Sequence, residues 1–244
     1  MPLDNRPSLP SLPFIKVCGL QSVADVQMCL SFEPAALGVV LVPNTPRFVP
    51  NATLQRMIHA SPNIPVVGVF QNASMETIIE TVLATGLRHI QLHTQEAPTP
   101  WQAVKALHQA LHEAVNERVS LMLVASLTAL PTHASLLPYL PYIDKLLLDW
   151  PKSATGATRS PDWQSPALRD WLQGWRTQWQ QACDAQGLTH FQGTLLAGKL
   201  TPQTVVDALA LPVEGIDLAS GVEDAVTGQK CHQRLQALWH CLGD

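Results

Sequence analysis

Two side chains capable of acid–base chemistry end short apolar runs of this 244-residue chain. Cys18 ends F-I-K-V-C, and Asp149 ends I-D-K-L-L-L-D. A carboxylate on a buried strand is costly unless it lies at an open end and is hydrogen-bonded, so the pattern favours a functional role for Asp149. Free cysteines are often buried in ordinary cores, which leaves Cys18 open to a structural interpretation. His93, which ends R-H-I-Q-L-H, is open to the same choice.

The runs that carry these residues belong to a series of eight expected strands. Each has the length of a strand and most lack polar alternation, which is typical of parallel strands buried on both faces. They are 14–18, 35–42, 65–70, 88–93, 119–124, 143–149, 193–197 and 215–219. Eight strands alternating with helices predict an α/β protein, a single-domain (β/α)8 TIM barrel over 14–244 after a flexible proline-rich lead, 1–13. An open, doubly wound sheet is the alternative.

Several helices between these strands have recognisable starts. Ser22 followed by Asp25 predicts a capping box. Three pairs place a hydroxyl N-cap before a proline at the first helical position: Thr99-Pro100, Ser165-Pro166 and Thr201-Pro202. Tryptophans at 171, 175 and 179 form one stripe of a helix, which predicts packing on the barrel wall rather than a ligand platform.

Two loops late in the chain carry glycine where a helix is expected to begin. The first contains Gly198 and Lys199, in L-A-G-K-L-T-P, and the second contains Ser220 and Gly221, in I-D-L-A-S-G-V-E. Small residues at a helix start let backbone N–H groups approach an anion. The loops after strands seven and eight are the usual phosphate site of a TIM barrel. These loops therefore predict a small phosphorylated substrate.

Composition excludes several classes of protein. Hydrophobic residues make up 46% of the chain and charged residues 14%, against about 25% charged in an average domain, so a large buried core is expected. With a net charge of −4 and no basic run, the chain is unsuited to a nucleic-acid backbone. No apolar stretch approaches a membrane span, and the lead, with four prolines, does not resemble a signal peptide. Its five cysteines lack metal-ligand spacing, so we expect reduced thiols, no metal and a cytoplasmic protein.

Taken together, these motifs resemble the phosphoribosylanthranilate isomerases, the barrel enzymes of tryptophan biosynthesis. The matches occur in family order over nearly the whole barrel. They are I-K-V-C-G (15–19), A-L-G-V-V-L-V-P-N-T-P-R-F-V (36–49), V-G-V-F-Q-N (67–72), I-Q-L-H (90–93), L-L-L-D (146–149), L-L-A-G-K-L-T-P (195–202) and G-I-D-L-A-S-G-V-E (215–223). Chance assembly of all of them in this order is implausible.

The resemblance implies a cofactor-free Amadori rearrangement of N-(5'-phosphoribosyl)anthranilate to 1-(2-carboxyphenylamino)-1-deoxyribulose 5-phosphate. It implies that Asp149 is the general acid, which protonates the furanose ring oxygen, and Cys18 the general base, which removes the C2 proton. Arg47 corresponds to the arginine that faces the anthranilate carboxylate, and His93 to a substrate-binding residue. The residues expected to hold the phosphate are Gly198, Lys199, Ser220 and Gly221.

The chain also departs from the family pattern. S-A-T-G (153–156) replaces G-G-T-G, Lys199 replaces the second glycine of A-G-G-L, Thr94 replaces the glycine after Q-L-H, and strand five lacks the expected lysine. A β-carbon in place of glycine can block close backbone approach, although Lys199 could add a charge beside phosphate. Two alternatives remain: a catalytically weakened barrel that binds a phosphorylated metabolite or a partner, and an isomerase of another aminoaldose phosphate, against which Cys18 argues. We expect a monomer, with a homodimer left open.

Overall fold

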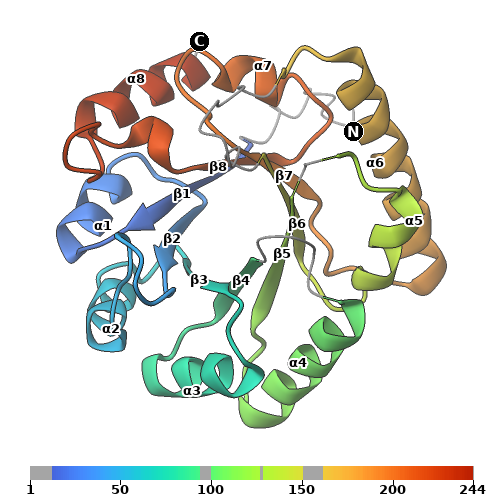
Figure 1. Cartoon of the computed structure of the whole chain (residues 1–244), viewed down its shortest axis with the longest axis horizontal. Coiled ribbons are helices and arrows are strands. Elements are labelled where there is room, and N and C mark those ends of the chain that lie inside the picture. The colour runs from blue at the N-terminus through green and yellow to red at the C-terminus, as the bar shows by residue number, and fades with distance from the viewer. Residues whose placement is uncertain (1–12, 94–99, 127–128, 151–161, 244) are drawn as a thin grey trace, which may run out of the picture.

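The eight predicted strands form a closed barrel. The computed structural model describes residues 13–93, 100–126, 129–150 and 162–243. Its strands are all parallel and pair in chain order, with the last strand paired to the first (Figure 1). They are β1 (Phe14–Leu20), β2 (Ala36–Val40), β3 (Val66–Gln71), β4 (His89–His93), β5 (Ser120–Ser126), β6 (Lys145–Asp149), β7 (Thr194–Ala197) and β8 (Gly215–Leu218). The TIM barrel is confirmed, and closure of the sheet rules out the doubly wound alternative.

The helices lie outside the barrel and connect successive strands (Figure 1). They are α1 (Val23–Leu30), α2 (Asn51–His59), α3 (Met75–Thr85), α4 (Trp101–Ala114), α5 (His133–Leu136), α6 (Pro166–Gln186), α7 (Val205–Leu209) and α8 (His232–Gly243), with short 3-10 turns η1 (Leu137–Tyr139) and η2 (Ser220–Val222). None of the described helices is both long and apolar enough to cross a membrane. Of the expected lead, residues 1–12 lie outside the described ranges.

Two of the four predicted helix starts are confirmed. The Ser22 hydroxyl accepts the N–H of Asp25 at 3.1 Å, and the Asp25 carboxylate accepts the N–H of Ser22 at 3.1 Å, so the capping box before α1 is present. Ser165 is the N-cap of α6, and Pro166 is the first residue of that helix. The Ser165 hydroxyl makes no capping hydrogen bond, so α6 begins where predicted through its proline rather than through a hydroxyl cap.

The other two predicted starts are wrong, by one residue for α4 and by three for α7. Helix α4 begins at Trp101 with Pro100 as its N-cap, and Thr99 lies outside the described residues. Helix α7 begins only at Val205. The residues before it form a turn, in which the Thr201 carbonyl accepts the N–H groups of Thr204 at 3.0 Å and Val205 at 2.9 Å. The hydroxyl of Thr204 accepts the N–H of Thr201 at 3.0 Å in the same turn.

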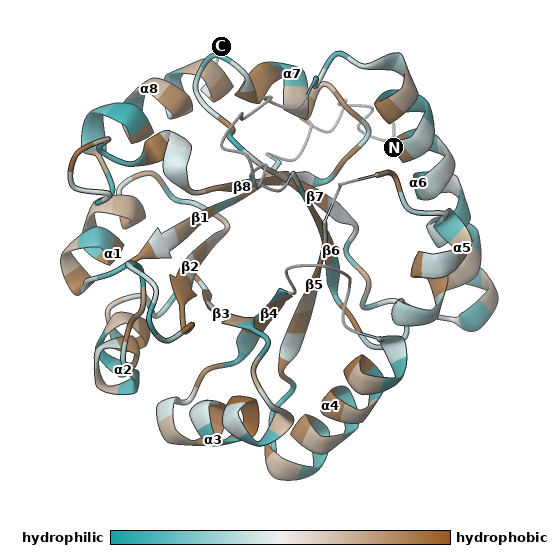
Figure 2. Ribbon diagram, in the orientation of Figure 1, coloured by the Kyte–Doolittle hydropathy of each residue, from teal (hydrophilic) through white to brown (hydrophobic). Residues whose placement is uncertain are grey.

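The core has two parts, one inside the barrel and one between the sheet and the helices. Met122, Val124, Leu147, Leu195 and Ala197 form a small apolar cluster within the barrel, and Phe14 packs against it. The larger cluster joins the outer faces of the strands to the helices. In Figure 2 hydrophobic residues follow much of the strands, while hydrophilic residues are common on the outer helices. Strands buried on both sides explain why the apolar runs lack alternation.

The tryptophan stripe of α6 packs on the barrel wall, as the spacing predicted. Trp175 is buried, and its Nε1 donates to the hydroxyl of Thr194 on β7 at 2.8 Å. Trp171 donates to the carbonyl of Pro131 at 2.8 Å. The ring of Trp179 stands edge-on to Phe191, with 5.0 Å between centroids. These contacts give the stripe a structural role.

Candidate active site

The predicted site residues lie at one end of the barrel. Cys18, His93 and Asp149 lie at or near the carboxyl ends of β1, β4 and β6. The glycine loops follow β7 and β8, and Arg47 lies in the segment that follows β2. Because the strands are parallel, their carboxyl ends share one rim (Figure 1). This rim is where TIM barrels place their active sites.

Cys18 is held where β1 leaves the barrel. The strand register shifts between Cys18 and Leu20, and Gly19 between them has a φ of +85°, which only glycine adopts freely. The Cys18 side chain is 7% exposed. Burial raises the pKa of its thiol above the ordinary value, although the neighbouring Lys16 ammonium opposes this effect. The thiol therefore lies within the barrel wall, next to a cation.

That cation belongs to an ion pair that sequence reasoning missed. Lys16 Nζ lies 3.0 Å from both carboxylate oxygens of Asp217 on β8, and both side chains are buried. Burial alone would lower the pKa of Lys16, but Asp217 and Cys18 raise it above its ordinary value, so the ammonium form is favoured. A lysine and an aspartate inside short apolar runs were a signal of this pair. The period of a strand also places Lys16 on the same face as Cys18.

His93 connects two strands of the rim. Its Nε2 lies 3.6 Å from the Asp149 carboxylate, and its Nδ1 lies 3.3 Å from the amide nitrogen of Gln71, the last residue of β3. If the Gln71 amide donates to Nδ1, Nε2 carries the ring proton and faces Asp149. A separation of 3.6 Å is longer than a hydrogen bond. The contact between His93 and Asp149 is thus electrostatic, and Gln71 fixes the ring that makes it.

Arg47 is also held by partners that the sequence analysis did not single out. Its Nη2 lies 2.6 Å from one carboxylate oxygen of Glu223, and the buried Lys230 ammonium lies 2.8 Å from the other. Burial would raise the pKa of Glu223, but hydrogen bonds from Arg47 and Lys230 lower it below its ordinary value. A Cβ added to Gly19 would lie 3.0 Å from Cδ of Arg47. Arg47 therefore lies over the turn that follows Cys18.

The two glycine loops pack against each other. A Cβ added to Gly221 would lie 1.7 Å from the carbonyl oxygen of Leu200, so only glycine allows this approach. Gly198 has a φ of +111°, and an added Cβ would lie 2.7 Å from Cβ of Trp150. Lys199 has a φ of 48°, in the left-handed region. That conformation accounts for the glycine expected at this position from the family pattern.

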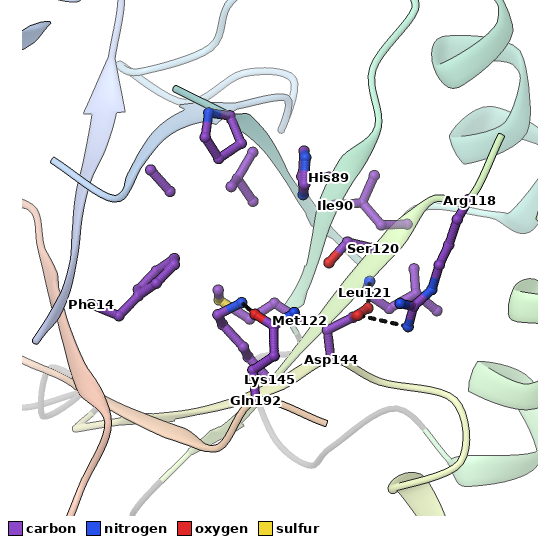
Figure 3. A pocket seen from close by; sticks show the side chains of 13 residues that line it. Phe14, His89, Ile90, Arg118, Ser120, Leu121, Met122, Asp144, Lys145 and Gln192 are labelled. Atoms are coloured by element: carbon purple, nitrogen blue, oxygen red, sulfur yellow. Dashed lines mark hydrogen bonds and ion pairs between the residues drawn. The ribbon is translucent and has the colours of Figure 1, made fainter. Parts of the chain in front are cut away.

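A cavity of about 310 Å³ occupies the opposite end of the barrel (Figure 3). Phe14, His89 and Lys145, which line it, are the first residues of β1, β4 and β6. The Lys145 ammonium donates to the side-chain oxygen of Gln192 and lies 4.5 Å from the centroid of the Phe14 ring. Burial lowers the pKa of Lys145. Because it lines the amino ends of the strands, this cavity is separate from the candidate site.

Of the four departures from the family pattern, Lys199 and the missing lysine of β5 fall on residues that the structure describes. S-A-T-G (153–156) and Thr94 lie outside the described residues. Strand β5 contains no lysine, as its sequence indicated.

Among the residues that the structure describes, no three His, Cys, Asp or Glu side chains converge in a way that could hold a metal ion.

Comparison with known proteins gives one consistent family. The family described as "N-(5'phosphoribosyl)anthranilate (PRA) isomerase" matches residues 15–240. The N-(5'-phosphoribosyl)anthranilate isomerase of Trichormus variabilis is 32% identical over 233 residues, which cover 94% of this chain and 98% of the relative. The phosphoribosyl anthranilate isomerase of Thermus thermophilus has a TM-score of 0.67 at 26% identity, covering 94% of this chain and 98% of that one.

A second solved structure of such an isomerase, in complex with reduced 1-(o-carboxyphenylamino)-1-deoxyribulose 5-phosphate, also has a TM-score of 0.67. It is 22% identical and covers 94% of this chain and 97% of that one. At this level of identity the likeness supports the fold.

Proposed function

Because this chain belongs to the N-(5'-phosphoribosyl)anthranilate isomerase family and is such an isomerase of tryptophan biosynthesis, we propose that Cys18 is the general base and Asp149 the general acid of its reaction. The reaction opens the ribose ring and moves a hydrogen from C2 to C1, so that an aminoaldose becomes an aminoketose. Asp149 gives a proton to the ring oxygen as the ring opens. Cys18 then takes the C2 proton, and the resulting enolamine tautomerises to the ketone.

One observation carries this assignment: the two groups have different surroundings on the same rim. Cys18 is buried beside the Lys16 ammonium; burial raises the pKa of its thiol, and the ammonium opposes this effect and can serve as the counter-charge of a thiolate that accepts a proton. Asp149 is 30% exposed and faces His93, so it can reach a substrate that enters from solvent. Proton transfer at two separate atoms of the substrate requires two positioned groups, and the barrel supplies them from β1 and β6.

We assign the substrate carboxylate to Arg47 and place His93 beside the ring-opening step. The planar guanidinium of Arg47 matches a carboxylate with two parallel hydrogen bonds. Glu223 binds one of its terminal nitrogens, and the side chain is one-third exposed, so the group is positioned yet open to a ligand. His93 contacts Asp149 and so lies near any ring oxygen that Asp149 protonates.

The phosphate is assigned to Gly198, Lys199, Ser220 and Gly221. Their two loops lie against each other through Gly221 and Leu200, and Ser220 is exposed. A cavity of about 380 Å³ adjoins them, lined by Gly221, Thr201 and Arg234. The Lys199 ammonium and the backbone N–H groups of the loops are both suited to an anion.

A complementation assay with purified-protein kinetics tests the acid–base pair. Wild type is expected to rescue a strain that lacks the isomerase, and Cys18→Ala and Asp149→Asn are expected not to. In vitro each variant should lose about 10²–10⁴-fold in kcat. Cys241→Ala, which alters a half-buried thiol on the last helix, is the matched control.

Turnover by Cys18→Ala at the wild-type rate would remove Cys18 from the mechanism. Stabilisation by substrate without turnover in the wild type would favour the binding-only barrel.

We further propose that the protein acts as a cytoplasmic monomer. Sedimentation equilibrium over a wide concentration range tests the oligomeric state, and a mass near 26.6 kDa is expected throughout. A mass near twice that value would establish the homodimer.

A further inference from the structure

A buried ion pair lies inside the barrel, one strand period below Cys18. Lys16 is fully buried, and Asp217 is 7% exposed. They come from β1 and β8, which pair directly, with Lys16 opposite Asp217 in the register. Isolating two charges from water is costly, and an apolar pair of similar size is often as stable or more so. The pair is therefore poorly explained as a source of stability alone.

The missing side chain of Gly38 on β2 leaves a space that Lys16 and Cys18 share. A Cβ added at Gly38 would lie 2.6 Å from Sγ of Cys18 and 2.9 Å from Nζ of Lys16. Gly38 is the direct register partner of Cys18. The ammonium and the thiol thus approach the same point on the inner face of the barrel. Any larger residue at position 38 would occupy that point.

We infer that Lys16 is the positioning residue that supplies the counter-charge of the Cys18 thiolate, and that Asp217 holds the ammonium and competes with the thiolate for it. This inference rests on the proposed role of Cys18 as the general base. It adds Lys16 and Asp217, which lie inside the barrel, to a mechanism whose other proposed residues lie at the rim.

The charged groups around Cys18 support this division of roles. Lys16 on β1, Asp217 on β8 and Lys230 after η2 face the thiol. Burial raises the pKa of Cys18 most; Lys16 lowers it through both charge and a hydrogen bond, Asp217 raises it, and Lys230 lowers it. Asp149 acts on Asp217 in turn. The two members of the ion pair therefore have opposite effects on the same thiol.

The proton balance follows from these charges. Before reaction the thiolate of Cys18 and the carboxylate of Asp217 share the Lys16 ammonium. When Cys18 takes the C2 proton, the S–H bond forms, the C–H bond electrons remain on the substrate, and Lys16 returns wholly to Asp217. Lys16 keeps its own proton throughout. The cluster of Lys16, Cys18 and Asp217 thus changes from one net negative charge to none.

Opposite effects of two variants test the inference. The rate at which iodoacetamide alkylates Cys18 is measured against pH, without substrate, by mass spectrometry of the Cys18 peptide. In Asp217→Asn the ammonium has only the thiolate as partner, so the profile should shift to lower pH, with alkylation at pH 7 about tenfold faster. In Lys16→Met/Asp217→Asn both charges are gone, and alkylation at pH 7 should be about tenfold slower. The pH profile of kcat/KM should shift in the same directions.

Cys29 provides the internal control in the same digest. Burial raises the pKa of its thiol to about 12, and the charges that act on it belong to Lys230 and Asp25, neither of which is changed in the two variants. Its alkylation should stay unchanged in both variants, whereas an opened barrel would expose both thiols together. Shifts of Cys18 in the same direction in both variants, or no shift in either, would overturn the inference. If the double variant does not fold, Asp217→Asn decides alone, and a profile that does not move to lower pH refutes the inference.

The proposed function fails by a different measurement. Retention of turnover by Cys18→Ala would exclude Cys18 as the base, yet the alkylation profiles would still report whether Lys16 sets the charge of the thiol. The two failures are therefore distinguishable.

Discussion

Nε2 of His93 lies 3.6 Å from a carboxylate oxygen of Asp149, while the opposite ring nitrogen faces the amide of Gln71 at 3.3 Å. The imidazole is thus oriented from β3 toward the proposed acid on β6. This arrangement restricts where the Asp149 carboxyl group can point. It also places a polar ring beside the proposed acid.

His93→Ala is therefore expected to lower kcat while leaving the fold intact. Loss of a weak polar contact costs about 1.4 kcal/mol, which corresponds to a tenfold lower rate. Gln71→Leu should produce a smaller loss, because the ring remains but is no longer fixed. His59→Ala, which removes an exposed histidine of α2 whose Nδ1 contacts the Gln55 carbonyl, is the control. Steady-state kinetics of the three variants check the order, and an unchanged kcat in His93→Ala would contradict it.

Glu223→Gln should weaken both the site and the fold. The substitution leaves the buried Lys230 ammonium without its carboxylate and frees Arg47 from its partner. Breaking a buried pair on one side costs about 3 kcal/mol, and a mobile Arg47 should raise KM more than it lowers kcat. Glu117→Gln, which alters an exposed ion pair with Arg88, is the control and should cost less than about 1 kcal/mol.

The stability difference between wild type and Glu223→Gln should depend on pH. Because the pKa of Glu223 is lower in the folded protein than its ordinary value of 4.5, its contribution is fully present above that value. It is lost as the pH falls from 4.5 through the lower pKa of the folded state. Urea unfolding at pH 7, 5 and 3 measures this. A difference that grows as the pH falls would show that the ion pair is not its source.

Lys199→Gly should stabilise the protein. The left-handed conformation costs a residue with a side chain roughly 1–2 kcal/mol, part of which is offset by the greater freedom of glycine in the unfolded chain. We expect a net gain of about 1 kcal/mol in the free energy of unfolding. Lys199→Ala removes the same charge but keeps a Cβ at a φ of 48°, so it should bring no gain. Equal stability of the two variants would exclude the backbone explanation.

The sequence predicted the features that depend on local pattern. Strands buried on both sides give continuous apolar runs, and the parallel direction of β1 and β6 then places Cys18 and Asp149 on one rim. The capping box of α1 was found because Ser22 and Asp25 lie within one turn. Each of these features requires only neighbours in the chain or the alternation of strands and helices.

The features that were missed depend on distant pairing. Asp217 is 201 positions from Lys16, and Glu223 is 176 positions from Arg47. A charged residue inside an apolar run signals that Lys16 and Asp217 each need a partner, but closure of the barrel, which brings β8 beside β1, decides which residue it is. The predicted start of α7 at Thr201-Pro202 was wrong for a local reason: residues 201–204 form a turn closed on the Thr201 carbonyl and the Thr204 hydroxyl.

Gly221→Ala should reduce phosphate binding by separating the two glycine loops. An added Cβ would lie 1.7 Å from the carbonyl oxygen of Leu200, so one loop must move. Since the phosphate is assigned to both loops, KM should rise more than tenfold while kcat falls less, a pattern that indicates lost substrate binding. Gly243→Ala, at a position where an added Cβ meets nothing within 4 Å, is the matched control. Thermal stabilisation by inorganic phosphate should also be smaller in Gly221→Ala. Equal KM values for both variants would show that contact between the loops does not build the phosphate site.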